Sequence, residues 1–567
     1  MSDSHKPLNV VFCWHMHQPD YRGPDDSAYQ LPWVYLHGIK DYVDMVAHLE
    51  AQPAARAVVN FAPVLLEQLA DYANQVKAWL DHGKLIRDPL LAALAGPGLP
   101  METDQRMELV SACLRANEKH LINRFPQYKK LSELAKWVEA NEGMGGYLND
   151  QFLIDILVWY HLAWMGESVR QNDLRIQSLQ KKAEGFSNED RRSLMQVIGE
   201  LLSGVIDRYR TLAEEGRIEL SVTPYAHPII PLLLDLQCAR EAMPDVVLPE
   251  MQEYPGGEAR ARWHIRKGIA TFKKHFGFCP VGCWPSEGGV SEETLRLLEE
   301  EGFRWAASGQ QVLHNSLTAS NPGAPLPDNW VHFPYRLNEG KLSCFFRDDG
   351  LSDLIGFTYA EWHADDAINN LIQHLETIAD AAPDDPDRVV SIIMDGENAW
   401  EYYPKNGCYF LDTLYKRLAE HPRLNLTTFS ECLKQRRAPA RNLTRLVAGS
   451  WVYGTFSTWI GDPDKDRAWD MLGDAKLAFD RVIETEQLSK RQKAKLELQL
   501  ATCEGSDWFW WFGDYNPAST VSDFERLFRR QLRHLYDMLG EPAPDYLARV
   551  FAVGSGEPAM GGVMKKN

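Results

Sequence analysis

Two carboxylic acids, Glu287 and Asp395, each stand just past a short apolar run that predicts a buried β-strand. These runs are Val281–Trp284 and Val389–Met394. Two carboxyl groups about 5–5.5 Å apart can cleave a glycosidic bond with retention, because one attacks the anomeric carbon while the other moves a proton. The alternative is that each carboxylate caps the helix after its strand, although Ser291 is a better N-cap than Glu287.

Polar and ionisable residues follow three further predicted strands in the same way. The strands and the residues after them are Leu8–Cys13 with His15–Pro19, Ile218–Val222 with Pro224–His227, and Leu342–Phe346 with Arg347–Asp349. The carboxyl ends of parallel strands converge on one face of a barrel, where active sites lie. We therefore expect these groups to share one pocket, although they are far apart in the sequence.

Short apolar runs alternate with amphipathic helices along the chain, which is the pattern of β/α units around a parallel sheet. Two more strands are expected at Ala57–Phe61 and Phe303–Ala307. The expected helices include Ile39–Glu50, Val64–Ala78, Ala259–His275 and Ser291–Glu300. Residues 165–212 are rich in Lys, Glu, Gln and Leu and predict a helical insertion.

A charged, proline-bearing break at Gln435–Asn442 predicts a domain boundary. Helical periodicity resumes in Asp464–Glu504 and Ser522–Leu539. We expect a catalytic domain at residues 1–434, a helical domain at 443–550 that completes the substrate cleft, and a loose tail at 551–567.

The composition excludes some partners. The 567 residues carry a formal net charge of −19, which disfavours nucleic acid and anionic membranes because both select basic patches. A neutral polysaccharide is indifferent to that charge, and the 18 tryptophans offer rings that can stack on sugars. We find no secretion signal and no run of about 18 apolar residues. The nine scattered cysteines predict reduced thiols in the cytoplasm.

Several segments, taken in order, resemble the successive sequence regions of glycoside hydrolase family 57, and especially its amylopullulanase-like and α-amylase-type members. They read CWHMHQP at 13–19, IELSVTPYAHPIIPL at 218–232, CWPSEGGV at 283–290 and MDGENAW at 394–400. Later segments, FFRDDGLSDLIGF at 345–357 and EGSDWFWW at 504–511, are also similar. Each motif alone is weak, but the ordered set covers residues 10–516.

The resemblance implies an α/β fold, an incomplete (β/α)7 barrel with helical insertions followed by a mainly helical C-terminal domain. It also implies that Glu287 is the nucleophile and Asp395 the general acid/base. His17 and His227 would bind the sugar beside the cleaved bond from opposite sides, and Trp508 would stack on a glucose ring. No cofactor or metal is implied.

Six more residues are candidate substrate contacts, and each could instead have a purely structural role. They are Gln18, Trp284, Arg347, Asp353, Glu397 and Trp400. Glu397 either binds sugar hydroxyls or fixes the Asp395 loop, and Arg347 with Asp353 forms either a paired support or a substrate clamp. We expect only His17 to face the pocket, with His15 behind it.

Four functions remain open from the sequence. The first is retaining hydrolysis of α-1,4-glucans, with α-1,6 bonds undecided, in a polysaccharide or a maltooligosaccharide. A 4-α-glucanotransferase or branching enzyme would use the same chemistry with a sugar hydroxyl in place of water. A metal-dependent polysaccharide deacetylase would instead need Asp and two His around an ion. The fourth is a non-catalytic glycan-binding protein. The sequence leaves the oligomeric state open.

Overall fold

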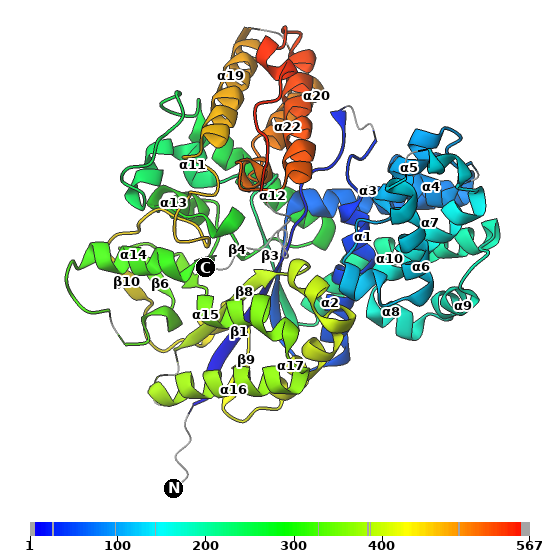
Figure 1. Cartoon of the computed structure of the whole chain (residues 1–567). Coiled ribbons are helices and arrows are strands. Elements are labelled where there is room, and N and C mark those ends of the chain that lie inside the picture. The colour runs from blue at the N-terminus through cyan, green and yellow to red at the C-terminus, as the bar shows by residue number, and fades with distance from the viewer. Residues whose placement is uncertain are drawn as a thin grey trace.

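The computed structural model describes residues 6–24, 28–96, 98–141, 143–326, 328–382, 385, 387–485 and 488–556. At its centre lies a curled, mainly parallel sheet (Figure 1). The strands are β1 (Leu8–Met16), β2 (Ala57–Phe61), β3 (Ile218–Val222), β4 (Gly282–Cys283), β5 (Trp305–Ser308), β6 (Tyr335–Leu337), β7 (Ser343–Phe346), β8 (Val389–Asp395), β9 (Leu424–Leu426) and β10 (Arg441–Leu443).

Seven of these strands run parallel in the order β8-β1-β2-β3-β4-β5-β7. The two ends of this row meet weakly, because β7 and β8 are joined by one isolated parallel bridge between Arg347 and Ser391. Contact between β3 and β4 is equally thin, a single pair of Val222 with Cys283. The fold is therefore an incomplete (β/α)7 barrel, as predicted.

All seven predicted strands correspond to barrel strands, because each is a short apolar run whose two faces are covered by other elements. The sequence pattern missed β6, β9 and β10, which are three residues long and lie at the margins of the sheet. β9 pairs in parallel with the first residues of β1, Leu8–Val10, while β10 pairs in parallel with β6.

Helices occupy the connections between the strands. Those that follow or flank barrel strands are α1 (Trp33–Ile39), α2 (Asp41–Ala51), α3 (Pro63–His82), α11 (Ile230–Leu234), α12 (Gly257–Phe276), α13 (Glu292–Glu300), α14 (Gln310–Ser320), α15 (Asp349–Asp353), α16 (Ala364–Ala381), α17 (Cys408–Ala419) and α18 (Phe429–Gln435). The four helices predicted in this part of the chain correspond to α2, α3, α12 and α13.

The connection from β2 to β3 carries a group of helices that Figure 1 shows on one side of the barrel. They are α4 (Pro89–Ala95), α5 (Thr103–Ala112), α6 (Pro126–Glu139), α7 (Asp150–Trp164), α8 (Glu167–Asn172), α9 (Leu174–Lys182) and α10 (Asn188–Glu214). The insertion expected at 165–212 coincides with α8 to α10, and the helical excursion begins earlier, at α4.

Past the barrel, the chain forms α19 (Pro463–Thr485), α20 (Lys490–Cys503), α21 (Asp507–Trp511) and α22 (Ala518–Leu539). The helices α19 and α20 both pack against α22, and all three stand above the barrel in Figure 1. The boundary expected between a catalytic domain ending at residue 434 and a helical domain starting at residue 443 stays a prediction. Residues 441–443 still belong to the sheet as β10, and most of the expected tail, residues 557–567, lies outside the described residues. Among the described helices, none combines the length and the apolar character needed to cross a membrane.

The short strand β4, which leads to Glu287, passes directly beneath a tryptophan. A Cβ atom on Gly282 would lie 1.7 Å from Cε2 of Trp305. That indole is fully buried and its Nε1 donates to Glu219 Oε1 at 2.7 Å, so the ring has no room to move aside. We expect Gly282→Ala to lower the free energy of unfolding by about 1–3 kcal/mol or more, as overpacking of a core does.

Urea denaturation measures this change. Gly204→Ala in α10 is the control, since a Cβ there meets no atom within 4 Å. Replacing a helical Gly by Ala at such a position should raise the free energy of unfolding by up to about 1 kcal/mol. Equal effects of the two substitutions would contradict the close packing of β4 on Trp305.

Candidate active site

A cavity of about 540 Å³ opens at the carboxyl ends of the barrel strands. Glu287 and Asp395 both line it, so the barrel brings the predicted catalytic pair into one space. The α4–α10 insertion contributes Trp164 to the wall, and the C-terminal part of the chain contributes Trp451 and Asp507. Three regions far apart in the sequence therefore enclose the site.

Glu287 lies in the short turn Ser286–Gly288 after β4 and has a left-handed backbone, with φ of 57°. This conformation is uncommon for a residue with a side chain and is found where surrounding structure enforces it. Trp451 supplies that support, because its backbone N–H donates to the Glu287 carbonyl and its Nε1 donates to Oε2, both at 3.0 Å. Ser291 caps α13, which removes the helix-cap explanation for Glu287.

Asp395 is the last residue of β8, and its register partner on β1 is His15. Its Oδ2 accepts a hydrogen bond of 2.8 Å from Asn398 Nδ2. Burial raises the pKa of Asp395, although the Asn398 amide and the charges of His17 and Arg347 oppose the rise. Burial penalises the charged form, so this carboxyl holds its proton to higher pH than an ordinary aspartate does.

Glu397 is a second carboxyl group beside Asp395 and is 2% exposed. Its Oε1 accepts from the backbone N–H of His17 and from Gln18 Nε2, each at 3.3 Å. Burial, with the neighbouring charge of Asp395, raises the pKa of Glu397 well above its usual range. Glu397 therefore fixes the His17-Gln18 segment while still lining the cavity. Its Oε2 has no hydrogen-bond partner among the described residues.

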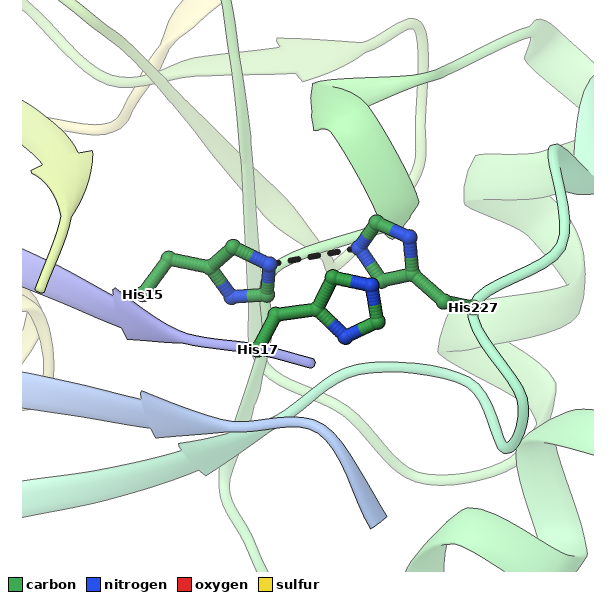
Figure 2. Close-up of side chains that lie close together, drawn as sticks. All are labelled: His15, His17 and His227. Carbon is green, nitrogen blue, oxygen red and sulfur yellow. Dashed lines mark hydrogen bonds between the residues drawn. The ribbon is translucent and has the colours of Figure 1, made fainter. Parts of the chain in front are cut away.

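Three histidines lie close together in this region, and Figure 2 shows their side chains. His15 and His17 come from the end of β1, and His227 comes from the loop after β3. His15 Nε2 and His227 Nε2 lie 3.2 Å apart, and the His17 ring stacks on the His227 ring with centroids at 3.8 Å. Burial and the neighbouring His17 lower the pKa of His15 to about 3, and burial lowers that of His227 well below its usual value.

One ring nitrogen from each histidine lies within 4.8 Å of the others, a spacing that could hold a metal ion. Their ring planes, however, are within 16–18° of parallel, so the in-plane lone pairs do not converge on one point. The contact between His15 and His227 is instead that of an N–H···N hydrogen bond between neutral rings. The arrangement supports a hydrogen-bonded cluster.

Both His15 and His17 line the cavity, so the expectation that only His17 faces it was wrong. Residues two apart on a strand point to the same face, and the two rings stack with centroids at 5.6 Å. His227 does not form part of the cavity wall. It lies behind His17, and its Nδ1 is 3.8 Å from Glu287 Oε1.

Each histidine ring is oriented by a side chain that contacts one of its two nitrogens. Asn60 Oδ1 is 2.8 Å from His15 Nδ1, Ser506 Oγ is 2.9 Å from His227 Nδ1, and Asp507 Oδ1 is 2.7 Å from His17 Nε2. Such contacts fix the ring orientation and the position of the ring proton. His17 Nδ1 is buried and has no hydrogen-bond partner among the described residues.

Arg347 lines the cavity, and protein groups bind its guanidinium. Its guanidinium donates to Asp349 Oδ1 and Asp353 Oδ1, both at 2.7 Å, and to the carbonyl of Ile393 at 2.9 Å. Asp353 lies in a separate hollow of about 580 Å³ next to the main cavity. The geometry favours the paired support for Arg347 and Asp353 over a substrate clamp.

The prediction that three tryptophans contact substrate was wrong, because all three lie in the protein core. Trp284, Trp400 and Trp508 are at most 1% exposed. Trp400 packs edge-on against Trp14, and Trp508 lies against Phe524 and Phe528 with its Nε1 bonded to the Thr502 carbonyl. The aromatic part of the cavity wall comes from other residues, namely Tyr21, Trp33, Trp164, Phe357, Trp451, Trp510, Trp511 and Phe524.

Sequence reasoning also missed the residues that hold the catalytic pair and the histidines. Asp507 lies within the EGSDWFWW segment, where the sequence analysis assigned a role only to Trp508. Asn398 lies within the MDGENAW segment and is bonded to Asp395. Trp451 follows no predicted strand and belongs to no recognised motif, so no local signal marked it.

The amino-acid sequence matches a known protein family. A model of "Glycosyl hydrolase family 57" matches residues 11–446. No curated protein matches the chain. Similar solved structures include a GH57 branching enzyme from Thermococcus kodakaraensis, with a TM-score of 0.57, 15% identity, and coverage of 94% of this chain and 89% of that one.

A GH57-type branching enzyme from Pyrococcus horikoshii has a TM-score of 0.54 and 16% identity, and the alignment covers 99% of each chain. The α-amylase AmyC from Thermotoga maritima has a TM-score of 0.55 and 13% identity, with 96% of this chain and 99% of that one covered. At such identities the structures show a shared fold. Since the family model covers most of the sequence, the chain belongs to glycosyl hydrolase family 57.

Proposed function

We propose that this enzyme is a retaining glycoside hydrolase of α-1,4-glucans, with Glu287 as nucleophile and Asp395 as general acid/base. Its substrates are α-glucan polysaccharides or maltooligosaccharides. The observation that carries the proposal is that two carboxyl groups from different barrel strands line one cavity, one of them accepting a hydrogen bond from Trp451 and the other, Asp395, with a pKa raised by burial. Family membership and the amylase and branching enzymes among the similar structures support it.

The reaction takes two displacements. In the first, Asp395 gives its proton to the glycosidic oxygen while a Glu287 oxygen attacks the anomeric carbon, so the bond to the leaving sugar breaks and a glycosyl ester forms. In the second, water gives a proton to Asp395 and attacks the same carbon, which releases Glu287. The Trp451 Nε1–H donates to Glu287, a contact that stabilises a carboxylate, and burial raises the pKa of Asp395, which favours its protonated form before the first step.

His17 and Glu397 line the cavity, and each carries a polar atom for which a sugar hydroxyl would be a suitable partner. His17 Nδ1 and Glu397 Oε2 have no partner among the described residues, and buried polar groups normally have one. The raised pKa of Glu397 favours its protonated form, which can donate or accept, and the lining rings of Trp33 and Trp511 offer stacking surfaces for glucose. We assign these residues to substrate binding. His227 acts indirectly, through His17 and His15.

Transfer to a sugar hydroxyl would need no change in this machinery. A 4-α-glucanotransferase or branching enzyme is therefore the second candidate, favoured by the branching enzymes of similar fold. The parallel histidine rings speak against the metal-dependent deacetylase. We also propose a cytoplasmic location, since all nine cysteines are free thiols and eight of them are buried.

We expect Asp395→Asn to lower kcat on maltoheptaose by about 10²–10⁴-fold, the usual contribution of a general acid–base group. Glu287→Gln should reduce turnover to the background rate, because no ester can form. Initial rates measured by chromatography of the products check both. Glu292→Gln, at the start of α13, should keep wild-type activity. Wild-type rates in either of the first two variants would remove the assigned roles.

Products longer than maltoheptaose would identify transfer instead of hydrolysis.

The pH profile tests the environment of Asp395. As pH rises through the raised pKa of this residue, the acid form is lost and kcat/KM falls. Asn398→Ala removes a donor to the ionised carboxylate, so the pKa of Asp395 should rise further and the alkaline limb should move to higher pH. One hydrogen bond of about 0.5–1.5 kcal/mol corresponds to a shift of about 0.4–1 pH unit. A limb that stays in place or moves to lower pH would contradict this assignment.

A further inference from the structure

We infer that Glu504 is a positioning residue of this active site, which locks the segment carrying Ser506 and Asp507 onto the barrel and thereby sets the His227 and His17 rings. The inference rests on the proposed function for its consequence in catalysis. Glu504 itself does not line the cavity, and it follows directly after α20, so it acts through its neighbours.

The Glu504 carboxylate is 1% exposed and is bound entirely by barrel residues on and before α12. Arg260 donates from Nε to Oε1 at 2.8 Å and from Nη2 to Oε2 at 2.7 Å. His264 Nε2 contacts Oε2 at 2.7 Å, and the Tyr254 hydroxyl donates to Oε1 at 2.6 Å. A bidentate arginine pair fixes direction as well as distance, so the end of α20 has one position on α12.

One route from this cluster reaches His227 through the barrel. The other ring nitrogen of His264, Nδ1, contacts the carbonyl of Tyr225, and the backbone N–H of Tyr225 donates to the His264 carbonyl at 3.0 Å. Tyr225 is two residues before His227. The ring that contacts Glu504 therefore also holds the loop that presents His227.

A second route runs along the chain. Gly505 brings the backbone so close that an added Cβ would lie 3.0 Å from the Ala226 carbonyl oxygen. The next residue, Ser506, donates from its backbone N–H to the His227 carbonyl at 3.0 Å, and its Oγ is 2.9 Å from His227 Nδ1. Asp507 then contacts His17 Nε2 at 2.7 Å.

The loop held between these routes is strained. Ala226 and His227 are consecutive residues with side chains, and both have left-handed backbones, with φ of 57° and 59°. Such conformations persist where the surrounding structure over-determines them. Glu504, its partners and the residues that follow it contact both sides of this turn. They thereby set the position of the His227 ring, which stacks on His17.

The cluster is not a pH switch. Burial opposes ionisation, but Arg260 and His264 lower the pKa of Glu504 to about 2, so it stays charged over the working range. A buried ion pair is by itself weak support for a large contribution to stability. The contacts of the following residues with two active-site histidines are what distinguish Glu504 from a purely structural ion pair.

The test compares Glu504→Gln with Glu525→Gln in the full chain. Glu525, on α22, is also a buried carboxylate paired with an arginine. Its partner, Arg529, lies on the same helix, so the pair does not connect two parts of the fold. We expect Glu504→Gln to lower kcat/KM on maltoheptaose by about 10–100-fold, since a displacement near 1 Å has that effect. We expect most of the loss in kcat. Glu525→Gln should change kcat/KM less than about 2-fold, whatever its effect on Tm.

Crystal structures of the two variants give a readout that needs no activity. In Glu504→Gln, the contact from Ser506 Oγ to His227 Nδ1 should lengthen beyond hydrogen-bond range; in Glu525→Gln it should not. A folded Glu504→Gln protein with wild-type kcat/KM and an unchanged His227 would overturn the inference. If wild-type protein fails to act on glucans, the proposed function fails while the crystal structures still decide the role of Glu504.

A third variant covers the case in which Glu504→Gln does not fold. Ser506→Ala removes the contact with His227 and leaves no buried charge unpaired. It should lower kcat/KM by about 5–10-fold, the free-energy equivalent of one hydrogen bond. If Ser506→Ala folds and retains wild-type kcat/KM, the positioning role is contradicted.

Discussion

The chemistry proposed for this chain depends on keeping two carboxyl groups of one cavity in opposite protonation states. Glu287 has to be ionised to attack, and Asp395 has to hold a proton to assist the leaving sugar. The structure gives the two groups different neighbours. Trp451 donates from its indole to Glu287, whereas burial at the end of β8 favours the neutral form of Asp395. Asn398 limits the rise, so that the proton can still leave.

The barrel supplies the two carboxyl groups proposed to react, but residues beyond it hold the site in place. Trp451 binds Glu287 through both its backbone and its indole, while Ser506 and Asp507 orient His227 and His17. These residues come late in the chain and reach a site built mostly from residues 15–398. The strained turns at Glu287 and at Ala226-His227 lie where these late segments meet the barrel. Catalysis and packing of the C-terminal helices are therefore linked.

Much of the fold could be predicted from the sequence because the barrel strands are apolar runs buried on both faces, and such runs are visible without knowledge of their partners. The strands β6, β9 and β10 were missed because three-residue strands carry too little pattern. The pairing of Glu287 with Asp395 was predictable because parallel strands end on one face.

Which tryptophans reach the cavity could not be predicted. Trp508 and Trp511 are three residues apart on α21 and both contact Phe524 of α22, so which of them also reaches the cavity depends on how α21 docks. The role of Trp451 depends on its contact with Glu287, which lies 164 positions earlier in the chain, and no local spacing reveals such a contact. His15 was misjudged for a simpler reason, since residues two apart on a strand share a face.

Trapping the glycosyl ester tests the central claim most directly. A 5-fluoro-α-glycosyl fluoride slows the second displacement, so the ester accumulates and can be located by mass spectrometry of peptides. The account predicts one added glycosyl group on the peptide containing Glu287, with its attachment at that carboxylate. An ester on Asp395 or Glu397, or turnover with inversion and no ester, would contradict it.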